Sequence, residues 1–265
     1  MLKQRPSFPA KLAPGLPQPK SRAVAASAAL RSAVRGMSKT PMAHDLAHGM
    51  DSSAVRMNMV AKLRLQGTTD PVVLGAMGRI ERHRFVDSAL VNQAYEDTSL
   101  PIGLGQTISK PSVVSRMVEL LRQNASGKLG RVLEIGTGCG YQAAVLGQLA
   151  TEVYSIERLR GLHDKARDNL RYLALPNVHL LLGDGMAGYA KGAPYAGIIS
   201  AAGGDGLPQA WIDQLAVGGR LVAPVSVAGG AKGQQALMVV DKTDSGVKHT
   251  ILEAVLFVPL KSGIA

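Results

Sequence analysis

The chain has 265 residues and a formal net charge of +11; 46% of residues are hydrophobic but only 4% aromatic, so aliphatic side chains must fill the core. Its single cysteine, Cys139, excludes an intramolecular disulfide and a multi-cysteine metal site, and is typical of a reducing compartment, so we expect a cytoplasmic protein. No apolar run approaches the roughly 20 residues that span a bilayer, and no membrane partner is expected.

The positive charge is concentrated in the first 44 residues. They contain eight Lys or Arg residues and no Asp or Glu, which leaves +3 (11 − 8) for the rest of the chain. Six of the fourteen prolines also lie here. Such a segment cannot bury enough apolar surface to offset chain entropy, so we predict a disordered leader over residues 1–50. Its composition also resembles an organelle transit peptide, and it would attract nucleic acid weakly by charge, but no dedicated nucleic-acid site is expected.

From Asp51 the pattern becomes that of a globular domain, which we expect to extend over residues 51–265. Apolar residues recur at helical spacing between Val55 and Leu63, and Gly67 is placed to end that helix. Asp70-Pro71 predicts the start of a second helix with one apolar face. His83 is flanked by arginines, so we interpret it as a solvated histidine rather than a catalytic base.

Residues 94–111 are rich in glycine and hydroxyl groups and lack the alternation of a strand. We therefore predict a loop that leads into an amphipathic helix beginning near Pro111. The expected buried stripe of that helix is Val114, Met117, Val118 and Leu121. Ser109 lies just before the helix, where the residue type alone favours a helix cap. A hydrolase is disfavoured, because no G-x-S-x-G elbow is present and no histidine lies nearby in sequence.

A short apolar strand, residues 131–135, runs into three glycines on alternate positions, Gly136, Gly138 and Gly140. A strand that turns into a helix through such a loop lets the backbone approach a ligand without a side-chain clash. Tyr141 stands where a dinucleotide fingerprint has its third glycine. With Glu134 just before it, the G-x-G-x-G loop resembles the S-adenosylmethionine loop of class I methyltransferases; a plain strand-to-helix turn is the alternative.

Two further strands are predicted to end in acids that face the same site. Residues 151–156 lead to Glu157, which is placed to accept the hydroxyls of a ribose; a solvated charge is the alternative. Residues 178–182 lead to Gly183-Asp184-Gly185, where Asp184 accepts from an adenine amino group or caps a turn. Strands are expected to begin near Arg131, Glu152, Val178, Gly197, Arg220, Gln235 and Thr250.

Two segments together closely resemble the protein-L-isoaspartate O-methyltransferase family. They are Leu-Pro-Ile-Gly-Leu-Gly-Gln-Thr-Ile-Ser-Lys-Pro at residues 100–111 and Arg-Val-Leu-Glu-Ile-Gly-Thr-Gly-Cys-Gly-Tyr at residues 131–141. Further matches are Gly183-Asp-Gly185, Pro208-Gln-Ala210, Gln214-Leu215, Gly218-Gly-Arg-Leu-Val222 and Phe257-Val-Pro-Leu260. The resemblance covers residues 55 to 262, and Gln-Thr-Ile-Ser is its most specific part because other class I methyltransferases lack it.

The resemblance implies a Rossmann-like α/β fold, a doubly wound and mostly parallel sheet of seven strands, in a monomer. Residues 51–124 would form an N-terminal helical lid, and residues 125–265 the cofactor-binding sheet and the C-terminal strands. The implied activity is transfer of a methyl group from S-adenosylmethionine to the side carboxylate of L-isoaspartyl residues in damaged proteins and peptides. S-adenosylhomocysteine would be the product, and no metal is implied.

The resemblance also assigns site residues. It places the active-site serine at Ser109. The expected cofactor-binding residues are Thr107, Ile108, Glu134, Gly136, Thr137, Gly138, Gly140, Glu157, Asp184 and Gly185. The acceptor is expected at Ser109 and Thr107, with Val258 and Leu260 in a segment that offers edge hydrogen bonds to an extended peptide.

The chain departs from the family pattern at two places. Ala196 replaces a usual aspartate at the start of the fourth strand, and the loop 201–206 is richer in glycine than usual, which leaves its stiffness open. Two other functions remain as alternatives: a class I methyltransferase of a small hydroxylated molecule, and a non-enzymatic module of this fold that binds nucleic acid through its leader. The Asn/Asp-Pro-Pro-Tyr/Phe signature of amino-group methyltransferases is absent, which disfavours methylation of nucleic acid.

Overall fold

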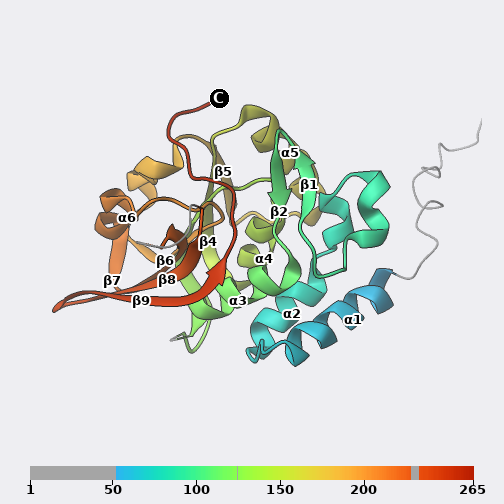
Figure 1. The fold of residues 1–265 in the computed structure, drawn as a ribbon, viewed down its shortest axis with the longest axis horizontal. Helices are drawn as coiled ribbons and strands as arrows, with labels where there is room; N and C mark the ends of the chain where they lie inside the picture. Colours follow the sequence, from blue (N-terminus) through green and yellow to red (C-terminus); the bar gives the residue numbers. More distant parts are fainter. Residues whose placement is uncertain (1–51, 124, 228–232) are drawn as a thin grey trace, which may run out of the picture. The chain divides into compact units, whose positions relative to one another are not determined.

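The computed structural model describes residues 52–123, 125–227 and 233–265 (Figure 1). The predicted leader, residues 1–50, lies outside them. The described residues belong to one compact unit, His48–Ala265. No helix among them is long and apolar enough to cross a membrane. Nor does this part of the chain gather three or more His, Cys, Asp or Glu side chains into a group that would hold a metal ion.

The chain enters the unit through two helices, α1 (Ser52–Leu65) and α2 (Pro71–Arg79). Gly67 ends the first as predicted, because its φ of 105° suits a residue without a Cβ. Asp70 caps the second as predicted: its carboxylate accepts from the amides of Val72 and Val73. The 3₁₀ helices η1 (Arg82–Phe85) and η2 (Ser88–Gln93) follow.

The prediction of a solvated His83 is wrong. The side chain is 5% exposed, and its Nδ1 lies 2.7 Å from the hydroxyl oxygen of Tyr95. Its neighbour Arg82 is fully buried: Nε donates to the Ala94 carbonyl at 2.8 Å, and the guanidinium stacks over the Tyr141 ring at 4.9 Å. Arg82 therefore links the N-terminal segment to Tyr141, which follows the glycine loop, and His83 is a packed residue rather than a catalytic base.

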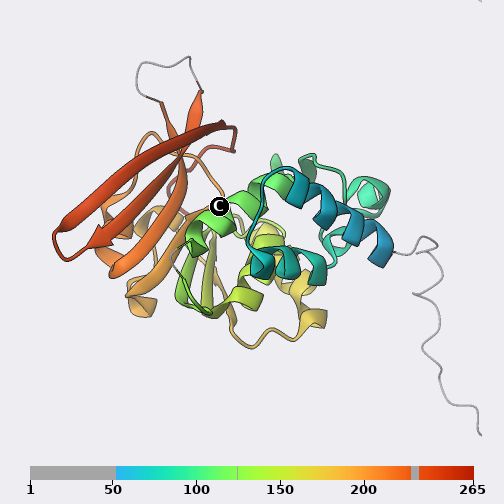
Figure 2. The same cartoon turned by 90° about the horizontal axis from the view of Figure 1, so that it is seen from below.

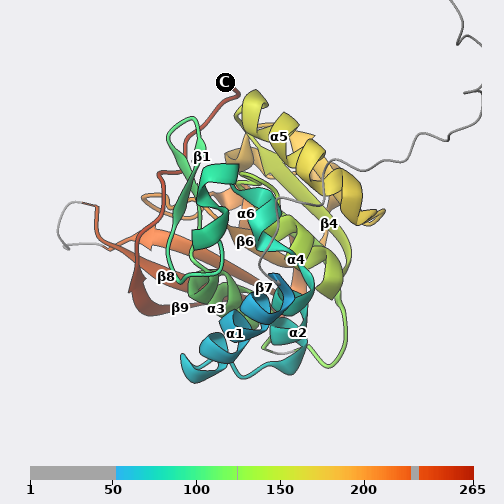
Figure 3. The same ribbon diagram turned by 90° about the vertical axis from the view of Figure 1, so that its right-hand side faces the viewer.

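Residues 100–108 form a small antiparallel hairpin where the sequence predicted a loop. Its strands are β1 (Leu100–Gly103) and β2 (Gln106–Ile108). The turn between them is left-handed at three successive residues, Gly103 to Gly105, with φ of 100°, 51° and 69°. The hairpin rests against α5 (Arg160–Leu170), where Lys165 Nζ donates to the Ile102 carbonyl at 3.0 Å (Figures 1 and 3). Helix α3 (Pro111–Arg122) follows, and its four predicted stripe residues are buried.

The predicted seven-stranded sheet is confirmed, in the order β5-β4-β3-β6-β7-β8-β9. Its strands are β3 (Leu129–Ile135), β4 (Ala150–Glu157), β5 (Val178–Leu182), β6 (Tyr195–Ser200), β7 (Leu215–Ser226), β8 (Gln235–Thr243) and β9 (Gly246–Val255). The first five in spatial order are parallel, and β8 runs antiparallel to both β7 and β9. Figure 2 shows the long strands β7–β9 at one end of the unit and the N-terminal helices at the other.

The central strands β3 and β6 are covered on both faces, so they carry apolar runs rather than alternating polar and apolar residues. In β3, Val132 joins the core shared with α1 to α5, whereas Leu133 points to the other face. In β6, Ile199 joins the first core and Ile198 points to the other face. Trp211 anchors the second core. The remaining helices are α4 (Tyr141–Leu149), α6 (Gln209–Gln214) and three 3₁₀ turns, η3 (Arg171–Leu173), η4 (Gly185–Ala187) and η5 (Ala190–Gly192).

The strand order places the ligand site. From β3 the chain moves outward through β4 to β5, and it then returns to pair β6 with the other side of β3. Helices that leave β3 and β6 thus diverge at the carboxyl ends of these strands, which is where open α/β sheets bind ligands. The glycine loop 136–140 lies at this point, and α4 and α5 lie side by side next to it (Figure 3).

Candidate active site

Two adjoining cavities open at the carboxyl edge of the parallel strands. The inner cavity, of about 300 Å³, lies between the hairpin, the glycine loop and the tip of β4. The outer groove, of about 440 Å³, lies between the start of α3 and residues 254–258. Four residues line both: Thr107, Ser109, Ala201 and Val258. A ligand in one cavity would therefore meet a ligand in the other at these residues.

The glycine loop forms one wall of the inner cavity. Gly136, Gly138 and Gly140 have φ of 88°, 57° and 91°, a conformation that favours glycine at each position. The amides of Gly136 and Thr137 donate to the Ile156 carbonyl, which holds the loop against β4. Gly136, Thr137 and Gly138 line the cavity. Gly140 does not: it is the N-cap of α4, and a Cβ there would lie 3.3 Å from Ala166.

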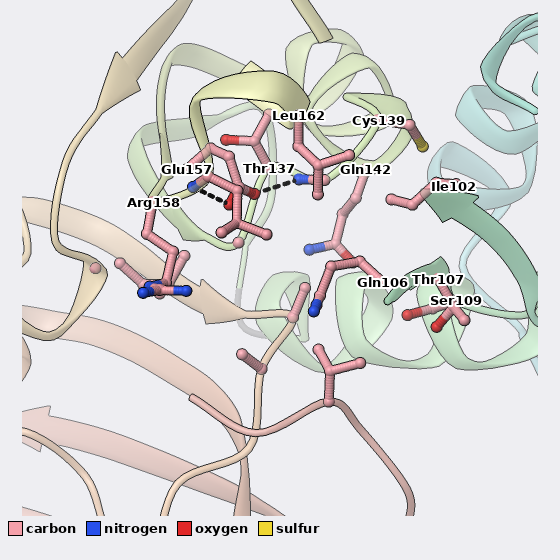
Figure 4. Close-up of a pocket in the computed structure, with 18 of the residues that line it drawn as sticks. Ile102, Gln106, Thr107, Ser109, Thr137, Cys139, Gln142, Glu157, Arg158 and Leu162 are labelled. Atoms are coloured by element: carbon pink, nitrogen blue, oxygen red, sulfur yellow. Dashed lines mark hydrogen bonds between the residues drawn. The ribbon is translucent and has the colours of Figure 1, made fainter. Parts of the chain in front are cut away.

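Glu157 lies at the tip of β4 and faces the inner cavity, 5% exposed. Its Oε2 accepts from the Gly138 amide and its Oε1 from the Leu159 amide, each at 2.9 Å (Figure 4). These bonds fix the carboxylate in place and tie it to the glycine loop. Each oxygen retains a second lone pair, so the carboxylate can also accept a pair of ligand hydroxyls.

Glu134 was expected to touch the cofactor, but the structure does not bring it to the inner cavity. The side chain is fully buried beneath the loop. Burial raises the pKa of Glu134 to about 8, a shift opposed by the Ser155 hydroxyl, which donates to Oε2, and by the nearby Gln142 amide. Ser155 in turn lies 2.6 Å from the Thr137 hydroxyl, so Glu134 supports the loop from below as a neutral acid at pH 7.

Stability should depend on pH through Glu134. Between its usual pKa of 4.5 and its folded pKa of about 8, the folded chain keeps a proton that the unfolded chain has lost. The free energy of unfolding therefore falls as pH rises through this window, by up to about 1.4 kcal/mol per pH unit, and levels off above it. Glu134→Gln should flatten the dependence. Urea unfolding of both proteins at pH 5, 6, 7 and 8 measures it, and parallel curves would contradict the assignment.

Asp184 and Gly185 follow β5. Asp184 does not line either cavity: its carboxylate accepts from the amides of Met186, at 2.8 Å, and Gly263, at 2.7 Å. It therefore caps η4, the alternative that the sequence left open, and it also holds the C-terminal tail. Gly185 does line the inner cavity. A Cβ at Gly185 would lie 2.5 Å from Ile135 Cγ2, so the close packing of β3 requires glycine there.

Ser109 is not a helix cap. The N-cap position of α3 is Lys110, and the Ser112 amide donates instead to Asp97 Oδ1 at 2.8 Å. Among the described residues, the Ser109 hydroxyl has no hydrogen-bond partner, and it lies beside Thr107 where the two cavities meet (Figure 4). Ile108, between them, is buried in the wall of the inner cavity.

Residues 256–260 are not a continuation of β9, which ends at Val255. Both main-chain groups of Phe257 pair with the side chain of Gln235. The Val258 carbonyl accepts from the Gly203 amide, and the Leu260 amide donates to the Gly203 carbonyl. Val258 lines both cavities and its amide has no partner within the described residues, whereas Leu260 lines only the inner cavity.

The structure also shows where the two departures from the family pattern lie. The glycine-rich loop is tied down, because Gly203 pairs with residues 258–260 and a Cβ there would lie 2.5 Å from Gln235 Nε2. Ala196 lies near the amino end of β6, beside Gly130 and far from the carboxyl edge that carries the cavities. The missing acid is therefore a structural change.

Several cavity residues were not predicted from the sequence. They include Gln142, Gln106, Arg158 and Lys261, which line the inner cavity (Figure 4). Cys139 lines the cavity as a small buried thiol, and burial raises its pKa to about 11, so it is not a nucleophile at neutral pH. Gln142 was within reach of the sequence, since it stands two residues after the last glycine of the loop.

Comparisons with known proteins bear on this geometry. Residues 54–265 match the family model described as protein-L-isoaspartate(D-aspartate) O-methyltransferase. Two curated relatives are named protein-L-isoaspartate O-methyltransferase. That of Leptothrix cholodnii is 60% identical over 219 residues, which are 82% of this chain and 76% of the relative. That of Methylibium petroleiphilum is 60% identical over 217 residues, which are 81% of this chain and 80% of the relative. A solved structure of that name has a TM-score of 0.70 at 28% identity, over 79% of this chain and 67% of its own. A Plasmodium falciparum structure in complex with S-adenosyl-L-homocysteine shares the fold, with a TM-score of 0.66 at 21% identity, over 78% of this chain and 98% of its own.

Proposed function

The chain belongs to the protein-L-isoaspartate(D-aspartate) O-methyltransferase family, and we propose that its inner cavity holds the methyl donor and its outer groove the damaged peptide. The protein is an enzyme that transfers a methyl group from S-adenosylmethionine to the side carboxylate of L-isoaspartyl residues, which begins their repair. One observation carries the assignment of the two cavities: Thr107 and Ser109 line both of them.

The residues of the inner cavity fit S-adenosylmethionine. Glu157 is an acid at a strand tip with lone pairs for two ribose hydroxyls, and it is fixed by two backbone amides. The side chains of Gln106 and Gln142 add polar groups to the wall of the same cavity. Aliphatic side chains such as Ile102 and Leu162 complete the wall. When bound, the cofactor supplies an electrophilic methyl group.

The acceptor needs no general base, because an isoaspartyl carboxylate is already an anion at neutral pH. What the protein has to supply is position. The unpaired hydroxyl of Ser109, with that of Thr107, donates to one carboxylate oxygen and aims the other toward the inner cavity. Holding two reactants in such an orientation contributes several kcal/mol toward the barrier. Part of the inner cavity is lined by buried apolar side chains such as Ile102, Ile135 and Leu162, and a site that excludes water favours a transfer that neutralises opposite charges.

Main-chain groups are suited to hold the rest of the peptide. The Val258 amide is free to donate into the outer groove, and Gln235 and Gly203 fix the backbone on either side of it. An extended peptide can pair with such an edge whatever its side chains are. This suits an enzyme whose substrates share one damaged residue rather than one sequence. Leu260 then contributes to the wall of the inner cavity rather than to peptide pairing.

We also infer that residues 51–124 act as a lid that delivers Ser109 to the sheet of residues 125–265, and that the protein works as a cytoplasmic monomer. In support, Ser109 comes from the segment between β2 and α3, whereas the glycine loop comes from β3. Sedimentation of the purified protein, with and without S-adenosylhomocysteine, tests the monomer.

The function is tested with matched peptides that contain Asp or isoAsp at one position. The protein is incubated with methyl-labelled S-adenosylmethionine, and base-labile label is counted. Label on the isoAsp peptide alone is the expected result. Equal label on both peptides, or label only on a small hydroxylated molecule, would contradict the proposal, and nucleic-acid binding without any transfer would favour the non-enzymatic alternative.

Deleting residues 1–44 should leave turnover of a short isoAsp peptide within about twofold, because a segment of this composition is not expected to make core contacts. Any nucleic-acid binding by the full chain should weaken steeply with salt and vanish on deletion. An inactive or unfolded truncated protein would show that the leader packs on the domain.

A further inference from the structure

Lys110 is the single charged residue among the described residues that line the outer groove. Three of the other lining residues carry hydroxyl groups, Ser99, Thr107 and Ser109, and the remaining ones are apolar. No Asp or Glu lines the groove in the part of the chain that the structure describes. The groove that we assign to the acceptor peptide therefore carries one positive charge and no negative charge.

Lys110 stands directly after Ser109, at the N-cap of α3. Lys110 and Val113, three residues apart at the start of this helix, both line the groove, so this side of the helix start faces it. The lysine is exposed, and its side chain forms no hydrogen bond or ion pair with any residue that the structure describes. Its ammonium group is therefore available to a ligand in the groove.

The acids on the elements that form the groove have partners of their own. Glu253 on β9 pairs with Arg116 of α3, whose Nε lies 2.7 Å from its Oε1. Asp97 accepts from the Ser112 amide at 2.8 Å. Neither acid lines the groove or pairs with Lys110, so a charged side chain of a bound peptide meets the lysine first.

We propose that Lys110 makes the enzyme select isoaspartyl sites by the charge of the neighbouring residues, so that acidic flanks are favoured over basic ones. In an extended peptide each residue advances about 3.3 Å, and the flexible four-carbon stem of a lysine reaches a side chain one or two residues from the carboxylate assigned to Ser109. Lys110 attracts Asp or Glu there and repels Lys or Arg. The inference rests on the proposed function, and it makes Lys110 a specificity-determining residue rather than a catalytic one.

The test compares three isoAsp peptides of one sequence that carry Glu, Gln or Lys on both sides of isoAsp. The measured quantity is kcat/KM for each peptide at about 0.01 M salt, and we expect the Glu peptide to be the best substrate and the Lys peptide the poorest. Lys110→Met keeps an unbranched side chain and removes the charge. It should lower the Glu-to-Lys ratio of kcat/KM by about fivefold, because an exposed charge pair gives a two- to threefold effect and two pairs are lost. Lys110→Glu should lower the ratio further and make the Lys peptide the better substrate.

Matched controls separate the competing explanations. Lys248→Met removes the same charge from an exposed position on β9 that lines neither cavity, and it should leave the ratio unchanged. Raising the salt to about 1 M shortens the Debye length from about 30 to 3 Å and should bring the wild-type ratio toward that of Lys110→Met. Because each ratio compares peptides on one protein, a loss of folded enzyme cancels.

The inference is overturned if Lys110→Met leaves the ratio unchanged, or if Lys248→Met lowers it as much. It is also overturned if Lys110→Met lowers kcat/KM equally for all three peptides, since Lys110 would then act on the isoaspartyl carboxylate that they share.

Failure of the proposed function would look different. A wild-type protein that methylates none of the three peptides would overturn the proposed function and this inference together. A wild-type protein that methylates all three with the same kcat/KM at low salt would overturn the inference alone.

Discussion

Replacing Ser109 with alanine is expected to lower the rate of methyl transfer by on the order of a hundredfold, because a misaligned acceptor loses that much. Affinity for S-adenosylhomocysteine and the melting temperature should barely change, since the Ser109 hydroxyl bonds to nothing else among the described residues and does not cap α3. Single-turnover rates with an isoAsp peptide, calorimetry and thermal unfolding measure the three quantities on one protein.

The matched variant for Ser109 is Asp97→Ala. Asp97 accepts from the Ser112 amide and so performs the capping role that Ser109 does not. Its loss should lower the free energy of unfolding by about 1 kcal/mol, whereas Ser109→Ala should not. If Ser109→Ala lowered the melting temperature by several degrees and left the single-turnover rate unchanged, Ser109 would be structural and the catalytic assignment would be wrong.

Glu157→Ala should weaken S-adenosylhomocysteine by roughly tenfold to a hundredfold, because bonds to a charged acceptor contribute about 1.5–3 kcal/mol. The loss has two sources: the ribose loses its acceptor, and the Gly138 and Leu159 amides lose the carboxylate that fixes them. Glu157→Gln keeps one acceptor oxygen and should weaken the compound less. Calorimetry at constant salt measures both.

Glu152→Ala provides the control for Glu157. Glu152 lies on the same strand, near its amino end, and pairs with Arg131 at the surface. Its loss should leave cofactor affinity unchanged. Equal affinity of the wild-type and Glu157→Ala proteins would mean that the ribose is held elsewhere in the inner cavity.

Much of the fold could be predicted because short-range chemistry decides it. Asp70 followed by proline determines the start of α2, and the left-handed glycines 136, 138 and 140 follow from the G-x-G-x-G spacing. The apolar runs of β3 and β6 reflect burial on both faces. The hairpin of residues 100–108 was missed because its strands are short and its turn includes a left-handed Leu104.

The sequence predicted many of the residues around the candidate site, but it did not predict which of their side chains point into it. Sequence spacing places Glu134 and Asp184 near the glycine loop, but it does not show which way each side chain points. Partners distant in sequence decide this, because the Ser155 hydroxyl donates to Glu134 and the Gly263 amide donates to Asp184. His83 is buried for the same reason, since Tyr95 and the helices around it close over a segment that looks charged in sequence.

The proposed pairing of the Val258 amide with an acceptor peptide has a consequence for the damaged proteins themselves. A main-chain donor between two fixed neighbours can only be reached by a backbone that has no other partner at that point. An isoaspartyl residue within a helix or a central strand must therefore open before it can be methylated. Each 1.4 kcal/mol of local opening free energy lowers the reactive population about tenfold. The order in which damaged sites are repaired would then follow the local stability of the substrate more than its sequence, and frayed ends and loops would be repaired first.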